Sequence, residues 1–139
     1  MQESKQMTRR KCAWLVLALS ACRERTPLPA DLFPQTLGAW RRTGQRDLPI
    51  SEAPDPVPRS NSGPARSATY EGPGRLEVRV YAMDSIDAGL ALAQRWRPSA
   101  DTVFFNQGRY FVVVKWQQAD RQALREFVRE MEKRLAPKR

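Results

Sequence analysis

Hydrophobic and polar residues alternate along residues 75–83, and this alternation predicts a strand with one buried face. The apolar positions are Leu76, Val78, Val80 and Ala82, and the opposite face carries Glu77, Arg79 and Tyr81. Residues 65–71 are expected to form a neighbouring strand, because Gly72-Pro73-Gly74 between the two segments is typical of a turn. The pattern therefore predicts a hairpin.

A second hairpin is indicated by two segments rich in aromatic and β-branched residues, 102–105 and 110–116. Asn106-Gln107-Gly108 between them tolerates the positive φ angles of a tight turn. Residues 38–43 predict one more short strand. Residues 47–64 contain five prolines, which remove backbone donors and restrict their neighbours, so we expect an extended loop there.

Apolar residues at helical spacing predict two helices, one after each hairpin. Asp84 or Ser85 can cap the first helix, Asp87 lies in its first turn, and Pro98 ends it. Its expected apolar stripe is Ile86, Leu90, Ala93 and Trp96. Asp120 caps the second helix, whose stripe is Leu124, Phe127, Val128, Met131 and Leu135, and Pro137 follows its end.

The predicted element order is β-β-β-α-β-β-α, which indicates an α+β fold. Consecutive hairpins imply a small antiparallel sheet, and we expect both helices to cover one face of it. Three regions follow along the chain: a signal peptide at 1–21, a lipidated N-terminus and flexible tether at 22–32, and one domain at 33–136 that includes loop 47–64.

The first 21 residues have the three parts of a secretory signal peptide. Residues 1–11 are polar and end in Arg9-Arg10-Lys11, residues 12–19 (CAWLVLAL) are apolar, and Ser20 and Ala21 are small. A bilayer-spanning helix needs about 20 apolar residues, so this run is too short to cross a membrane. Translation from Met7 would give a more compact signal, and both starts agree with the sequence.

Leu19-Ser20-Ala21-Cys22 resembles the lipobox of bacterial lipoproteins, in which two small residues separate a Leu from a Cys. The resemblance implies a diacylglyceryl thioether on Cys22, cleavage between Ala21 and Cys22, and acylation of the new amino group. Such an anchor is stable, since each buried CH₂ contributes about 0.8 kcal/mol. Arg23 stands where some Gram-negative lipoproteins carry an Asp for inner-membrane retention, which favours the periplasmic side of the outer membrane. The alternatives are an ordinary signal with an incidental Cys22 and an uncleaved amphipathic start.

The remaining chain resembles an uncharacterised class of bacterial envelope domains. The resemblance runs from FPQTLGAW (33–40) through LEVRVYAMDS (76–85) to RYFVVVKW (109–116) and the last helix, and it rests on hydrophobic pattern. It implies export and an α+β fold, and it implies no activity.

The charge of the chain favours anionic partners. Its 24 basic and 15 acidic residues give +9, and removal of residues 1–21, which hold four basic residues and one acidic residue, leaves 20 and 14, or +6. There is no His, and both cysteines, Cys12 and Cys22, precede the predicted domain, so we expect no internal disulfide, no metal site and no cofactor.

Catalytic groups are not evident in this sequence, and we expect a protein that is not an enzyme. Asp84 and Asp87 lie near each other in sequence, and helix capping explains them better than acid–base chemistry. Ser85 has no base partner in view. Glycines Gly72 and Gly74 belong to a turn rather than to a phosphate-binding loop.

Arg121, Arg125, Arg129 and Lys133 recur every four residues, which places them along one side of the last predicted helix. They could contact anionic headgroups or cell-wall polymer, at about 1 kcal/mol per basic group. The alternative, which the sequence favours, is a solvated side neutralised by neighbouring glutamates, namely Glu126, Glu130 and Glu132.

Three hypotheses on function remain open. The first is a membrane-tethered envelope protein that binds a protein or an anionic polymer. The second is a lipid-anchored domain that holds a small ligand or glycan, in a pocket lined by Trp40 and loop 47–64. The third, if the signal is misread, is a small basic nucleic-acid-binding protein. Five aromatic residues could stack against nucleic-acid bases or sugars, but packing within the hairpin explains them better: Phe104, Phe105, Tyr110, Phe111 and Trp116. Export argues against nucleic acid, and the oligomeric state is left open.

Overall fold

The alternating residues 75–83 form strand β4 (Gly74–Met83), which pairs with β3 (Ser62–Gly72) in the predicted hairpin. The computed structural model describes residues 28–53 and 62–137. Gly72 pairs with Gly74, so the strands are joined through Pro73 alone. Pro64 lies beside a shift in the pairing register between Ser62 and Ala65, where a residue without an amide hydrogen disturbs the ladder least.

The second hairpin consists of β5 (Thr102–Gln107) and β6 (Tyr110–Gln117), as expected. Its turn is shorter than predicted, because Gln107 already pairs with Tyr110 and only Gly108 and Arg109 connect the strands. Gly108 has a φ of 58°, a conformation that suits glycine. The two hairpins join through β6, which pairs antiparallel with β4 and leaves β5 at the edge of the sheet.

The N-terminal strands extend the sheet further than the sequence indicates. The predicted strand 38–43 is β2 (Trp40–Leu48), preceded by the two-residue β1 (Thr36–Leu37). The expected loop 47–64 is wrong at both ends, because Asp47 and Leu48 belong to β2, and β3 already begins at Ser62. A short 3-10 helix, η1 (Ile50–Glu52), follows β2, and residues 54–61 lie outside the described part.

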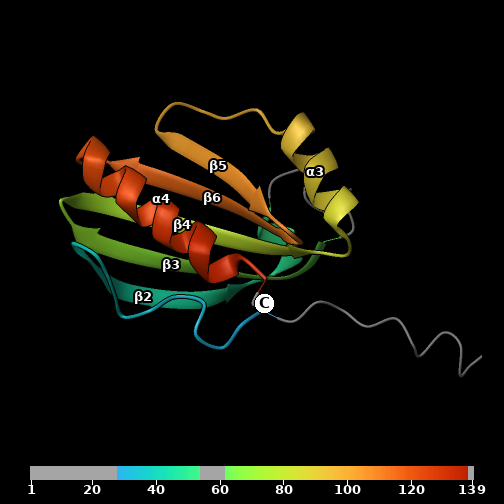
Figure 1. The fold of residues 1–139 in the computed structure, drawn as a ribbon, viewed down its shortest axis with the longest axis horizontal. Helices are drawn as coiled ribbons and strands as arrows, with labels where there is room; N and C mark the ends of the chain where they lie inside the picture. Colours follow the sequence, from blue (N-terminus) through green and yellow to red (C-terminus); the bar gives the residue numbers. More distant parts are fainter. Residues whose placement is uncertain (1–27, 54–61, 138–139) are drawn as a thin grey trace, which may run out of the picture.

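The result is a curled six-stranded antiparallel sheet in the order β1-β2-β3-β4-β6-β5, with two α-helices (Figure 1). Helix α3 spans Ile86–Arg95 and is capped by Ser85, whose Oγ accepts from the Ala88 amide at 3.0 Å. Helix α4 spans Arg121–Leu135 and is capped by Asp120, whose Oδ2 accepts from the Ala123 amide at 3.0 Å. The α+β class and the capping residues predicted from sequence are confirmed.

The helices lie on opposite faces of the sheet, so the expectation that both cover one face is wrong. Val112 and Val114 of β6 belong to the core cluster under α4, whereas Phe111 and Val113 belong to the cluster that contains Leu92 of α3. Successive residues of a strand point to opposite faces. Since all four of these residues are apolar, β6 is buried on both sides. The strand has no polar face in this stretch, so a helix can cover either face of the sheet here.

The apolar stripe predicted for α3 is wrong in part. Ile86 is 55% exposed and Leu90 is 47% exposed, while the buried positions of the helix are Gly89 and Leu92. A Cβ on Gly89 would lie 3.5 Å from the carbonyl oxygen of Gly108. That distance is an ordinary van der Waals contact, so Gly89 marks the side of α3 that packs against the β5–β6 turn, and Ile86 and Leu90 lie on the exposed side.

The segment before β1 adds to the layer on the α4 face. Leu32 and Phe33 are buried in the core beneath α4, so packing begins within the segment expected to be a tether. The predicted signal peptide, the cleavage position Ala21–Cys22 and the lipid attachment site Cys22 lie outside the described residues. No helix within residues 28–53 and 62–137 is long and apolar enough to cross a membrane.

Candidate functional site

One helix and one short segment cannot cover the α4 face of this sheet. Neighbouring strands lie about 4.8 Å apart, so six strands span roughly 24 Å, while a helix with its side chains is only about 10–12 Å wide. Leu32 and Phe33 pack on one side of α4, and β5 forms the opposite edge of the sheet. The uncovered strip is therefore expected between α4 and the β5–β6 hairpin.

Contacts to β2 and β3 fix α4 to one side of the sheet. Trp40 Nε1 donates to the carbonyl oxygen of Ala123 at 3.1 Å, which ties β2 to the first turn of the helix. The ring of Phe127 packs edge-on against both Trp40 and Tyr70, with ring centroids 6.3 Å and 5.1 Å apart. These aromatic contacts draw α4 toward β2 and β3, and so away from β5.

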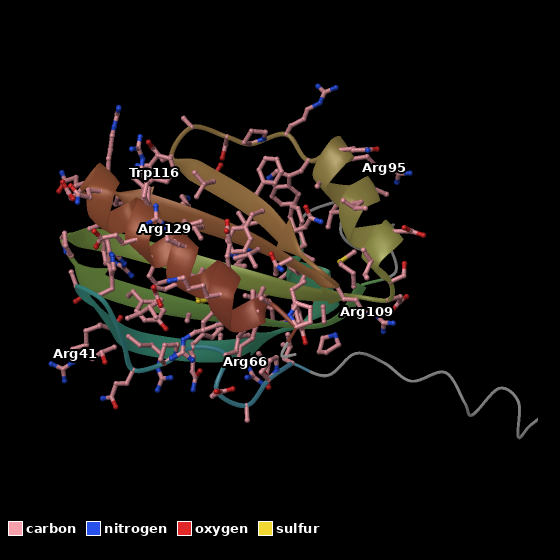
Figure 2. The ribbon with its side chains drawn as sticks, viewed as in Figure 1. Arg41, Arg66, Arg95, Arg109, Trp116 and Arg129 are labelled. Atoms are coloured by element: carbon pink, nitrogen blue, oxygen red, sulfur yellow. The ribbon has the colours of Figure 1, made fainter. Side chains whose placement is uncertain are left out.

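The space left on the other side is a groove of about 560 Å³, which we call the α4 groove. Its apolar lining comes from Val103 of β5, Trp116 of β6, and Leu124 and Val128 of α4. Its charged lining comes from α4 alone: Arg121, Arg125, Arg129 and Glu132. The volume is in the range of small-molecule sites, about 300–1,000 Å³. Trp116 and Arg129 mark the two sides of this groove in Figure 2.

The three arginines of the groove are exposed and, among the described residues, make no ion pair with an acidic side chain. The glutamates that the sequence placed beside them are mostly directed elsewhere. Glu126 and Glu130 line a different hollow of α4, next to the β1–β2 turn. Glu132 alone borders the groove, so three positive charges face one negative charge there.

Lys133, the fourth member of the predicted basic line, is separate from the groove. Its Nζ lies 3.3 Å from Glu130 Oε1, and the residue borders a second hollow at the C-terminal end of α4, together with Arg134 and Pro29. The interpretation as a neutralised side thus fits Lys133. It does not describe Arg121, Arg125 and Arg129.

The predicted aromatic cluster is divided between the two faces. Phe104 and Phe111 pack together on the α3 face, with ring centroids 5.8 Å apart, and Phe111 is fully buried. Phe105, Tyr110 and Trp116 lie on the α4 face, packed against its core. Of the five residues, Trp116 alone lines the α4 groove. A continuous stacking platform for nucleic-acid bases is therefore not formed by these side chains.

Trp40 does not line a pocket with residues 47–53. It is buried on the α4 face, whereas Leu48 packs into the cluster on the α3 face. No group of three or more His, Cys, Asp or Glu side chains that could hold a metal ion occurs in the described ranges. Ser85, considered as a nucleophile, is occupied in capping α3.

Comparison with known proteins adds no assignment. No family model matches this chain, and neither a curated protein nor a solved structure is significantly similar to it. The α4 groove is thus characterised by its own geometry. Its arginines were predicted from their spacing, but Val103 and Trp116 were not singled out as its floor, because their proximity to α4 depends on the position of β6 between β4 and β5.

Proposed function

We propose that this protein is a lipid-anchored domain of the bacterial envelope that binds anionic membrane lipid in the α4 groove. An acyl chain would lie on the apolar floor, against Trp116 and Val128, and the phosphate of the headgroup would contact Arg121, Arg125 and Arg129. The observation that carries this proposal is the groove itself, in which an apolar floor adjoins three arginines that have no acidic partner within residues 28–53 and 62–137. Arginine suits phosphate because its planar fork of donors can bind two oxygens at once.

The lipobox-like sequence LSAC supplies the second argument, because an acyl anchor would hold the domain near a lipid surface. Only five residues lie between Cys22 and Leu28, the first described residue. The six Cα–Cα steps from Cys22 to Leu28 span at most about 20 Å. Pro29 borders the same hollow as Lys133 and Arg134, so the C-terminal end of α4 would be held close to the membrane.

The anchor is tested by intact mass and membrane fractionation of the full chain and of Cys22→Ser, both expressed in a bacterial host. We expect loss of residues 1–21, an added mass equal to diacylglyceryl plus an acyl chain, and release of Cys22→Ser from the membrane fraction. A full-length, unmodified and soluble product would contradict the anchor. It would leave the binding properties of the groove to be judged separately.

The groove is tested with the Cys22→Ser chain by co-sedimentation with vesicles of phosphatidylcholine, with and without phosphatidylglycerol. The double variant Arg121→Gln/Arg125→Gln removes two rim charges, at about 1 kcal/mol each, so we expect roughly 30-fold weaker binding to the anionic vesicles. The matched control Arg95→Gln/Arg97→Gln removes the same charge from exposed positions at the end of α3. Figure 2 shows Arg95 far from Trp116 and Arg129.

An apolar substitution separates groove binding from simple surface attraction. Val128→Ser removes part of the floor, and Leu90→Ser removes a comparable apolar side chain from the exposed side of α3. We expect Val128→Ser to weaken binding to anionic vesicles and Leu90→Ser to leave it unchanged. If the two charge variants bind equally well, or Val128→Ser has no effect, lipid binding in the groove is refuted.

A further inference from the structure

The face of the sheet opposite α4 is covered over only part of its length. Helix α3 packs on the end of the sheet that carries Tyr81, Met83 and Phe111, and Trp96, at the C-terminal cap of α3, is packed against the same cluster. Next to Trp96 lies a cavity of about 190 Å³, which we call the α3-side cavity. Its lining comes from three strands and the helix cap: Glu77, Arg79, Tyr81, Trp96, Thr102, Val113 and Lys115.

The strand register brings the polar side chains of this cavity together. Glu77 pairs with Lys115 across β4 and β6, and Lys115 pairs with Thr102 across β6 and β5. Arg79 stands next to Glu77 on the same face, with Arg79 Nε 2.9 Å from Glu77 Oε1. The lining therefore holds two cations and one carboxylate, which leaves the cavity one net positive charge.

Tyr81 supplies a buried donor without a partner. Its side chain is fully buried, and its hydroxyl proton has no acceptor within the described residues. Burial raises the pKa of Tyr81, and although hydrogen bonding to Arg79 and the charge of Arg79 oppose that rise, the phenol stays protonated near neutrality and its proton remains available to an acceptor. Buried hydroxyl groups in folded proteins are nearly always hydrogen-bonded, so this donor calls for an acceptor in the cavity that it lines.

We propose that the α3-side cavity binds a small carboxylate with an apolar body. The carboxylate accepts a hydrogen bond from Tyr81 and is held by the positive charges of Arg79 and Lys115. The apolar body lies against Trp96 and Val113. The cavity has the volume of about six water molecules, which limits the ligand to the size of a single ring or a short branched acid.

The test uses the full Cys22→Ser chain and benzoate as the probe, with benzyl alcohol as an uncharged probe of similar shape. Binding is followed by the indole N–H resonances in NMR spectra, which separate Trp96 from Trp116 once each is assigned with a Trp→Phe variant. We expect benzoate to shift the Trp96 resonance in a saturable manner and to leave Trp116 unchanged. Tyr81→Phe should weaken benzoate roughly tenfold or more, because a hydrogen bond to a charged group is lost.

Tyr110→Phe is the matched control, since it removes a phenol hydroxyl on the α4 face, and benzoate should bind this variant as it binds the parent. The proposal is overturned if Trp96 does not respond to benzoate. It is also overturned if benzyl alcohol binds equally well or if Tyr81→Phe leaves benzoate binding unchanged, because the cavity is then merely apolar. The two sites lie on opposite faces, so a failure of lipid binding at Trp116 leaves this test intact.

Discussion

Two tyrosine hydroxyls in this fold are predicted to have opposite effects on stability. Tyr70 and Tyr81 are both fully buried. Tyr70 Oη donates to the carbonyl oxygen of Pro34 at 2.7 Å and so ties the segment before β1 to β3. The Tyr81 hydroxyl has no acceptor for its proton in the described part of the chain. The same substitution, Tyr→Phe, therefore removes a formed bond in one case and an unsatisfied group in the other.

The expected magnitudes follow from the cost of polar burial. Tyr70→Phe loses a hydrogen bond whose net contribution is about 1 kcal/mol, and it keeps the ring contact with Phe127 at 5.1 Å. A loss of that size lowers the Tm by about 4–8 °C in a domain of this length. Tyr81→Phe removes a hydroxyl that is desolvated without compensation, so its effect on the free energy of unfolding should lie between zero and about 1 kcal/mol of stabilisation.

The assay is equilibrium unfolding in urea, with the midpoint compared at unchanged slope so that the change reports stability rather than compactness. The parent chain and both variants are measured without added carboxylate. A loss for Tyr81→Phe as large as that for Tyr70→Phe would refute the reasoning. The Tyr81 hydroxyl would then have a partner, such as a bound water, in the ligand-free protein, and the α3-side cavity would lose its free donor.

Three further predictions concern the core, the turns and alkaline pH. Leu92→Ala should cost about 2–5 kcal/mol because Leu92 is fully buried, whereas Leu90→Ala should change urea unfolding by less than about 0.5 kcal/mol. Gly74→Ala should lower the free energy of unfolding by more than about 2 kcal/mol, because φ is +132° and the new Cβ would lie 2.7 Å from the Cα of Ala119. At Gly44 a new Cβ meets open space, so Gly44→Ala should be neutral or should stabilise the fold by up to about 1 kcal/mol. Burial raises the pKa of Tyr70 to about 12 in the folded protein. Because the unfolded chain loses this proton at lower pH, stability that is present below pH 10 should fall as the pH approaches 12. Thermal melts of Tyr70→Phe should show a smaller decline over the same pH range.

Local patterns predicted most of the elements of this fold. Alternation identified β4, turn residues identified both hairpins, and short polar side chains identified the caps of α3 and α4. Each of these features depends on residues close together in sequence. The arginine line on α4 was predicted for the same reason, because a helix places every fourth residue on one side.

Helix orientation could not be obtained in this way. In α3 the apolar residues Ile86 and Leu90 are as hydrophobic as the buried Leu92, and periodicity alone does not say which side faces the sheet. The orientation is seen only in the tertiary packing, where Gly89 and Leu92 face the sheet and the β5–β6 turn. The ends of β2 were missed for a related reason, since its polar residues are accommodated only because β3 pairs with them.

The amino-acid sequence by itself determined most of the segments that form strands and helices, the residues that cap both helices, and which residues carry an unbalanced positive charge. Only the tertiary structure decided that β6 lies between β4 and β5, that α3 and α4 occupy opposite faces, and that Val103 and Trp116 lie across from Arg125. The physical reason is that β6 is apolar on both faces, so local pattern specifies neither its pairing with β4 nor the helix that covers each face. Helix α4 is held toward β2 and β3 by its contacts with Trp40 and Tyr70. Because the sheet is wider than the helix, the part of the sheet near β5 and β6 stays uncovered.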